Sequence, residues 1–164
     1  MEAIRAHVVS FVILFVVAIF PNDVMKATKS KWYECIRPSI TPPNIVFPVV
    51  WGILYTLIAL ALAQTLMLSE AEGNKKKELL WFFGVNLVLN MVWTLLYFGL
   101  KEVTAAFIVI IGLILSQVMI MKLAWSALPR WTFWTLIPYI AWLVFAGVLN
   151  WISIGKAGKC AKWL

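Results

Sequence analysis

Residues 47–68, FPVVWGILYTLIALALAQTLML, decide the class of this protein, because the stretch contains no charged side chain and is long enough to cross a bilayer. The hydrocarbon core of a bilayer takes about 20 apolar residues in helical form. Four further long, mainly apolar stretches are present, at residues 6–25, 79–100, 104–125 and 131–154. The sequence therefore predicts an all-α membrane protein, a five-transmembrane-helix bundle formed by the single domain 1–164. The connections between the last four spans are short, so those helices must lie antiparallel to their neighbours.

The composition supports this class and excludes several others. Apolar residues make up 63% of the 164 residues and charged residues only 13%, whereas ordinary globular domains carry about 25% charged residues. Such a composition excludes a cytosolic enzyme, a disordered chain and a nucleic-acid-binding domain. The net charge of +7 comes mainly from Lys and Arg in the connections, where anionic lipid headgroups attract them. We therefore expect membrane lipids, and no nucleic acid, as partners.

The distribution of Lys and Arg also predicts the orientation, because cytoplasmic loops carry more of these residues. The first and third connections and the C-terminal tail carry eight of the 14, and the N-terminus and the other two connections carry six. The sequence therefore predicts a cytoplasmic C-terminus. The two cysteines, Cys35 and Cys160, lie outside the spans, and their number and spacing predict neither a disulfide framework nor a zinc site.

The first connection, residues 26–46, is the one long connection in the sequence. Its second half, residues 37–44, reads RPSITPPN, and the three prolines make it stiff and extended. Long connections in compact proteins often act as lids over a site. Aromatic and aliphatic residues on both sides favour a lid-like loop that packs on the bundle, and a linker without a role is the alternative.

Ionisable side chains are absent from the middle of the last four spans. The second and fifth spans contain no Asp, Glu, Lys or Arg, and Lys122 stands near the end of the fourth. Ion-coupled pumps place such residues inside the membrane, and metal centres need His, Cys or carboxylate ligands. We therefore expect no metal, no obligatory cofactor and no polar catalytic residue, and we expect neither a pump nor an acid–base enzyme.

Aromatic and amide side chains form stripes on three of the spans. Residues three, four and seven apart share a helix face. This spacing joins Trp51 with Tyr55, Asn86 with Asn90, Trp93 and Tyr97, and Pro138 with Trp142, Ala146 and Leu149. One interpretation is helix–helix contact, since Asn side chains hydrogen-bond across membrane bundles. The other is a pocket for a large flat ring that stacks on indoles while amides fix its orientation. Spacing alone leaves both interpretations open.

Three groups of motifs resemble a known family. The first group lies around the first connection and consists of Trp32-Tyr33, Arg37-Pro38, Pro42-Pro43, Val46-Phe47, Val50-Trp51 and Leu54-Tyr55. The other two lie in the third and fifth spans and consist of Leu89-Asn90, Trp93, Tyr97-Phe98-Gly99, Pro138-Tyr139, Trp142, Phe145-Ala146 and Leu149-Asn150. In this order they resemble the tryptophan-rich sensory protein and translocator protein family (TspO, peripheral benzodiazepine receptor). The resemblance covers nearly the whole chain from Trp32 onward.

The resemblance implies a five-helix bundle, often a homodimer, with a ligand cavity that the first connection covers. Members bind porphyrins such as protoporphyrin IX and haem, so a porphyrin or haem is the expected ligand. By position and shared helix face, the expected ligand-binding residues are Trp51, Tyr55, Asn86, Asn90, Trp93, Trp142, Ala146 and Leu149. The short extramembrane parts resemble those of prokaryotic members, which implies a plasma membrane.

Three functions are compatible with this resemblance. The first is a tetrapyrrole-binding sensory or translocator-type protein, in which loop cations such as Arg37 or Lys31 would pair with the propionates. The second is a light-dependent porphyrin-degrading enzyme, with radical chemistry on Trp51 and Trp142. The third is a carrier of tetrapyrroles or sterol-like lipids.

Overall fold

The computed structural model describes residues 1–19, 30–69 and 73–163, and every regular element in these ranges is a helix. The elements are α1 (Glu2–Ile19), α2 (Lys31–Ile36), α3 (Val46–Leu66), α4 (Gly73–Thr94), η3 (Leu95–Gly99), α5 (Val103–Ala127), α6 (Arg130–Cys160) and η4 (Ala161–Trp163). Within these described ranges, five helices are long and apolar enough to cross a membrane, namely α1, α3, α4 continued by η3, α5 and α6. The predicted all-α fold with five membrane spans is therefore confirmed.

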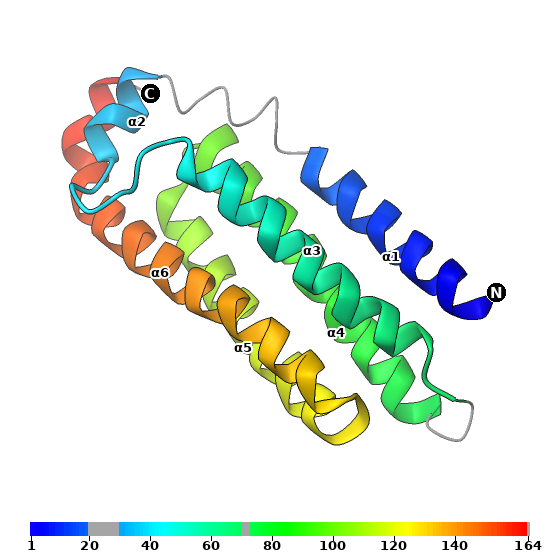
Figure 1. Cartoon of the computed structure of the whole chain (residues 1–164). Coiled ribbons are helices and arrows are strands. Elements are labelled where there is room, and N and C mark those ends of the chain that lie inside the picture. Colours follow the sequence, from blue (N-terminus) through cyan, green and yellow to red (C-terminus); the bar gives the residue numbers. More distant parts are fainter. Residues whose placement is uncertain (20–29, 70–72, 164) are drawn as a thin grey trace.

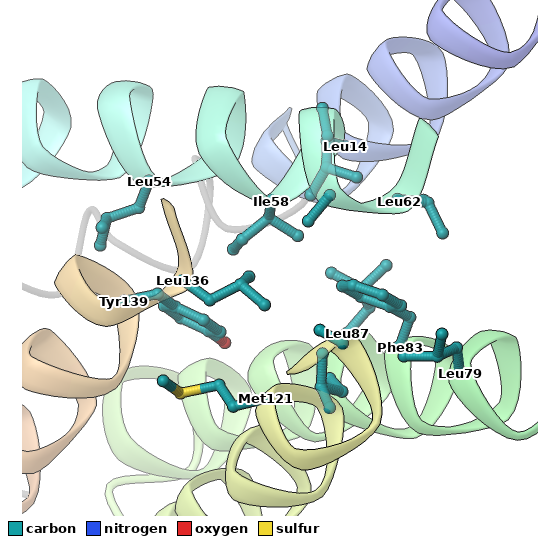
Figure 2. Close-up of a cluster of buried hydrophobic side chains, with 14 of the residues drawn as sticks. Leu14, Leu54, Ile58, Leu62, Leu79, Phe83, Leu87, Met121, Leu136 and Tyr139 are labelled. Carbon is teal, nitrogen blue, oxygen red and sulfur yellow. The ribbon is translucent and has the colours of Figure 1, made fainter. Parts of the chain in front are cut away.

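The long helices run side by side as one bundle (Figure 1). α4 packs on α5, α5 packs on α6, and α3 contacts both α6 and α4, while α1 lies against α3 on the outside. Large apolar side chains meet between these helices, among them Ile58, Phe83 and Leu136 (Figure 2). Outward-facing side chains are apolar as well, and Val88 and Leu115 are more than half exposed. An apolar surface of this extent suits lipid, so the chain is a multi-pass integral membrane protein.

The helix ends differ from the predicted span ends where polar residues continue a helix. α4 begins at Gly73 rather than at residue 79, and α6 ends at Cys160 rather than at residue 154. α1 begins at Glu2, and its predicted end (20–25) and the predicted start of the first connection (26–29) lie outside the described residues. Hydrophobicity marks the part of a helix that lies in lipid, so polar extensions of a helix are not detected by it.

The first connection contains a short helix that packs on the bundle. Ser30 precedes α2, and its side-chain oxygen accepts a hydrogen bond from the Tyr33 N–H at 3.2 Å, which is a common way to begin a helix. Trp32, Tyr33 and Ile36 are buried in a cluster with η3, the start of α5 and the end of α6. We call residues 30–45 the lid, because this segment lies on the bundle.

The two cysteines form a disulfide, although their number and spacing predict no disulfide framework. The Sγ atoms of Cys35 and Cys160 lie 2.05 Å apart, and their Cα atoms lie 5.8 Å apart. The bond joins the lid helix α2 to the last residue of α6 across a sequence separation of 125. Such a pairing depends on the folded bundle, and two isolated cysteines in the sequence do not reveal it.

Candidate functional site

A cavity of about 370 Å³ lies between α1, α3, α4 and α6 at the lid end of the bundle. Most of its lining is aromatic or small. The lining residues are Ala18, Phe47, Pro48, Trp51, Gly52, Tyr55, Asn90, Trp93, Thr94, Phe98, Trp142 and Ala146. None of these lining residues is ionisable at neutral pH, and the described part of the chain brings no three His, Cys, Asp or Glu residues together as a metal site.

The aromatic rings of the cavity lie in contact with one another. The rings of Trp51 and Tyr55 on α3 have centroids 5.1 Å apart and planes inclined by 31°. The Phe47 ring meets the Trp142 ring edge-on at 5.7 Å and so connects α3 to α6. Rings in such contacts restrict one another's orientation. The cavity therefore presents aromatic faces and edges that are arranged before a ligand binds.

Asn90 is the polar centre of the cavity. Its Oδ1 accepts a hydrogen bond from Tyr55 Oη, and its Nδ2 donates one to Tyr139 Oη, and each of these bonds is 3.4 Å long. Bonds of this length are weak, so a polar atom of a ligand can replace them at small cost. The Trp93 Nε1–H is already paired, because it donates to Asn150 Oδ1 at 3.1 Å. Trp93 therefore offers a ring to the cavity rather than a hydrogen bond.

The structure brings six of the eight predicted ligand-binding residues together. The six that line this cavity are Trp51, Tyr55, Asn90, Trp93, Trp142 and Ala146. Leu149 lines a smaller neighbouring cavity of about 30 Å³ between the lid and the bundle. Whether these residues bind a ligand stays a prediction.

Asn86, the remaining predicted residue, lies between helices and is only 2% exposed. Its Nδ2 donates to the Leu113 carbonyl at 3.1 Å and to Ser116 Oγ at 2.8 Å, and its Oδ1 accepts from Tyr139 Oη at 2.7 Å. These bonds connect α4 to α5 and α6. Asn86 is not part of the cavity lining, so its position is that of a helix–helix contact.

Several lining residues were not selected from the sequence. Phe47 and Thr94 each lie one helical turn from a selected residue, Trp51 and Asn90 respectively, so the spacing rule contained a signal for both. Phe98 lies in η3, where a π-helical turn changes which residues share a face. The α1 residue in the lining had no sequence signal, because that helix carries no aromatic–amide stripe.

A groove of about 450 Å³ between α1 and α3 adjoins the cavity. Ala18, Gly52 and Tyr55 line both spaces. A Cβ atom placed on Gly52 would meet no other atom within 4 Å. Phe15, on the α1 side of the groove, is 66% exposed. The cavity therefore opens sideways, toward the surface that faces lipid.

The cation Arg37, an expected partner of propionates, holds the lid together. Its Nη2 donates to the Thr41 carbonyl at 3.3 Å and to the Pro42 carbonyl at 2.7 Å. Its own carbonyl accepts from Lys156 Nζ at 2.8 Å. Burial raises the pKa of the Tyr33 phenol above its ordinary value, and the Arg37 charge partly opposes this. Tyr33 therefore stays uncharged at neutral pH.

Comparisons with known proteins find relatives of this chain. The sequence profile of the TspO/MBR family matches residues 8–154. Protein CrtK of Rhodobacter capsulatus is 35% identical over 122 residues, which cover 73% of this chain and 74% of that protein. Tryptophan-rich protein TspO of Chlorobaculum tepidum is 32% identical over 136 residues, with 80% and 83% covered. The Translocator protein of Homo sapiens is 30% identical over 123 residues, with 73% and 71% covered.

Proposed function

Because the chain belongs to the TspO/MBR family, we propose that it is an integral-membrane tetrapyrrole-binding protein of the sensory or translocator type. The proposed ligand is a porphyrin, protoporphyrin IX or haem, in the cavity lined by Trp51, Asn90 and Trp142. The observation that supports this most directly is the chemistry of the lining, which among the described residues offers aromatic rings, one weakly held amide and no charge.

The rings, the amide and the nearby cations of this site each suit one part of a flat macrocycle. The indoles of Trp51 and Trp142 supply stacking and edge contacts, which contribute about 0.5–1.5 kcal/mol per aromatic pair beyond the burial of area. The Asn90 amide can turn to a ring nitrogen or a substituent, since its present bonds are long. The charged propionates would lie at the lid end, where Lys101 and Lys156 approach the lid.

Titration of the purified protein with protoporphyrin IX in the dark tests this proposal. Tryptophan quenching and the Soret band follow the binding. We expect saturable binding with a Kd that rises about ten-fold in Trp142→Ala and in Ala146→Leu. Trp134→Ala is the control, because Trp134 lies on the same helix but is 63% exposed and outside the cavity lining. Unchanged affinity in both cavity variants, with helix content intact, removes this cavity as the site.

Light-dependent porphyrin degradation is the second candidate function. Trp51 and Trp142 both line the cavity, and the described lining residues include no acid–base pair and no activated nucleophile. The chemistry would therefore run through indole radicals generated by the light-excited pigment. Illumination under oxygen tests it. Faster loss of the Soret band with the wild type than with Trp142→Phe supports degradation, and equal loss without protein reduces it to photochemistry of the free pigment.

For the location we propose a prokaryotic plasma membrane, on the basis of the bacterial relatives. For the orientation two observations differ. The Lys and Arg count favours a cytoplasmic C-terminus by eight to six, whereas disulfides such as Cys35–Cys160 form and persist in oxidising compartments. A margin of two charges is small, so we propose that the lid and the C-terminus face away from the cytoplasm. An active C-terminal alkaline phosphatase fusion supports this orientation, and a fluorescent C-terminal GFP fusion restores the cytoplasmic prediction.

The family resemblance also leads us to propose a homodimer. The small residues Ala106 and Gly112 of α5 do not supply its interface. Ala106 is fully buried under the lid, and a Cβ on Gly112 would lie 3.4 Å from Leu89 Cδ1 of the same chain. The interface must therefore use other lipid-facing side chains. Chemical cross-linking in native membranes tests the proposal, and monomers alone would contradict it.

A further inference from the structure

In the described part of the chain, a disulfide and two lysine side chains fasten the lid to the bundle, in addition to the packing of its aromatic and aliphatic side chains. The Cys35–Cys160 disulfide ties α2 to the end of α6. The Lys156 ammonium donates to the Arg37 carbonyl at 2.8 Å, and the Lys101 ammonium lies 5.7 Å from the centre of an indole ring of α2. Among these three, the disulfide is covalent and is the one that a change in redox conditions can break.

Helix α2 depends on such contacts for its position. It has six residues, whereas an isolated helix needs about 12–15 residues to be even marginally stable in water. Its inward side chains Trp32, Tyr33 and Ile36 are at most 5% exposed and form one cluster with Cys160. Without the disulfide this packing is the main restraint, and local unfolding of the lid becomes more frequent.

The lid also forms part of the wall around the proposed ligand site. Tyr33, Pro38 and Thr41 line the smaller cavity, and the Thr41 hydroxyl is buried there without a hydrogen-bond partner. This smaller cavity and the main cavity share four lining residues, namely Phe47, Trp93, Phe98 and Ala146. The rings of Tyr33 and Phe98 lie 5.7 Å apart. Movement of the lid therefore changes the wall of both cavities.

We infer that the Cys35–Cys160 disulfide is a redox-controlled clamp on the ligand cavity. In the oxidised state the disulfide holds α2 on the bundle and slows ligand exchange. Reduction to two thiols lets the lid open and speeds exchange. The identity of the ligand rests on the proposed function, whereas the movement of the lid can be tested without any ligand.

The chemistry is thiol–disulfide exchange with a reductant of the dithiol class. Cys160 is 1% exposed and Cys35 is partly exposed, so a thiolate of the dithiol attacks the Cys35 sulfur and Cys160 leaves as a thiolate. The second thiol of the reductant then displaces Cys35 and closes the reductant's own disulfide. Two electrons pass to the cysteine pair, and each cysteine takes up one proton. A disulfide-bearing oxidant reverses these steps and closes the clamp.

Hydrogen exchange measured by mass spectrometry tests the movement of the lid without ligand. The oxidised wild type is compared with the dithiothreitol-treated wild type and with Cys35→Ala/Cys160→Ala, in which alanine keeps the surroundings of Cys160 apolar. We expect amides of residues 31–37 to exchange about ten-fold faster in the last two samples, while amides in the middle of α5 around Leu113, which lies outside the lid cluster, are unchanged. Dithiothreitol should have no effect on the double variant, which is the control for other effects of the reductant.

The second measurement is the dissociation rate of protoporphyrin IX into an excess of scavenger protein. We expect the rate to rise about ten-fold in the reduced wild type and in the double variant. Equal lid exchange in oxidised and reduced protein overturns the inference, as do free thiols on both cysteines in protein taken from membranes without reductant. Faster lid exchange with an unchanged dissociation rate overturns the effect on the cavity. Faster lid exchange without porphyrin binding in either state overturns the proposed function and leaves the redox-controlled lid standing.

Discussion

Replacement of Asn86 by leucine should lower stability and leave ligand affinity almost unchanged. The Asn86 side chain makes three hydrogen bonds of 2.7–3.1 Å to α5 and α6. Hydrogen bonds between membrane helices contribute about 0.6 kcal/mol on average and up to about 1.7 kcal/mol each. Three such bonds predict a loss of about 2–3 kcal/mol in the free energy of unfolding. Leucine is similar in size to asparagine, so no large cavity adds to this loss.

Unfolding by SDS in mixed micelles, followed by circular dichroism, measures the stability. Asn90→Leu is the matched control, because it makes the same chemical change one helical turn away. Both side-chain bonds of Asn90 are 3.4 Å long, so we expect this variant to lose less than about 1 kcal/mol. Asn90 lines the cavity, and its affinity for protoporphyrin IX should fall about ten-fold.

The reasoning is refuted if the two variants show the opposite pattern. A ten-fold weaker affinity in Asn86→Leu at unchanged stability would mean that Asn86 contacts the ligand rather than the neighbouring helices. Unchanged stability together with unchanged affinity would mean that the three short hydrogen bonds contribute nothing to the packing of α4 on α5 and α6.

Three further outcomes are expected. Trp32→Ala removes a side chain that is 1% exposed and should reduce the packing free energy that holds the lid by about 3–5 kcal/mol. Faster hydrogen exchange of the lid would reveal this loss, and unchanged protection of the lid would contradict it. Gly52→Leu and Gly84→Leu should both fold, because a Cβ at either position meets no atom within 4 Å. Only Gly52 lines the cavity, so only Gly52→Leu should weaken porphyrin binding. Equal porphyrin affinities of the two variants would contradict this. Burial raises the pKa of Tyr33 in the folded state. The contribution of the Tyr33 phenol to stability is therefore complete below the unfolded pKa of about 10 and is lost as the pH rises through the folded pKa. The loss of stability between neutral and strongly alkaline pH should be smaller in Tyr33→Phe than in the wild type, and an equal loss in both proteins would contradict this assignment.

The membrane spans could be predicted because each is a long apolar stretch with few or no charges. The prediction was least accurate where a helix leaves the hydrocarbon, as at Gly73 and at Cys160. Backbone hydrogen bonding continues a helix there without apolar side chains, so hydropathy has no information about the end. The short helix α2 gave one local signal, the Ser30 cap, but six residues are too few for a periodic pattern.

The cavity lining could be predicted in part because helical spacing collects residues on one face. Asn86 and Asn90 show the limit of that rule. Residues four apart on a helix point in directions that differ by about 40°, and this difference places Asn90 at the cavity and Asn86 against α5 and α6. The sequence spacing is the same for both interpretations. The partner helices decide between them, and their rotation is a property of the packed bundle.

The disulfide could not be predicted because its two cysteines become neighbours only when the lid has docked on the end of α6. The docking itself depends on η3, where Tyr97 and Phe98 are adjacent and both buried. Tyr97 Oη donates to Ser153 Oγ at 2.8 Å, since that serine donates to the Leu149 carbonyl. Phe98 contacts Tyr33 of the lid and also lines the cavity.

Lid and cavity are therefore mechanically coupled through this turn. A ligand that displaces the Phe98 ring also disturbs its contact with Tyr33 in the lid, and release of the lid removes the support of the Phe98 ring. Tyr97 is hydrogen-bonded to Ser153 of α6, so we expect the turn itself to stay folded in either case. A covalent bond at Cys35, two residues after Tyr33, thus acts on the cavity wall without contacting it.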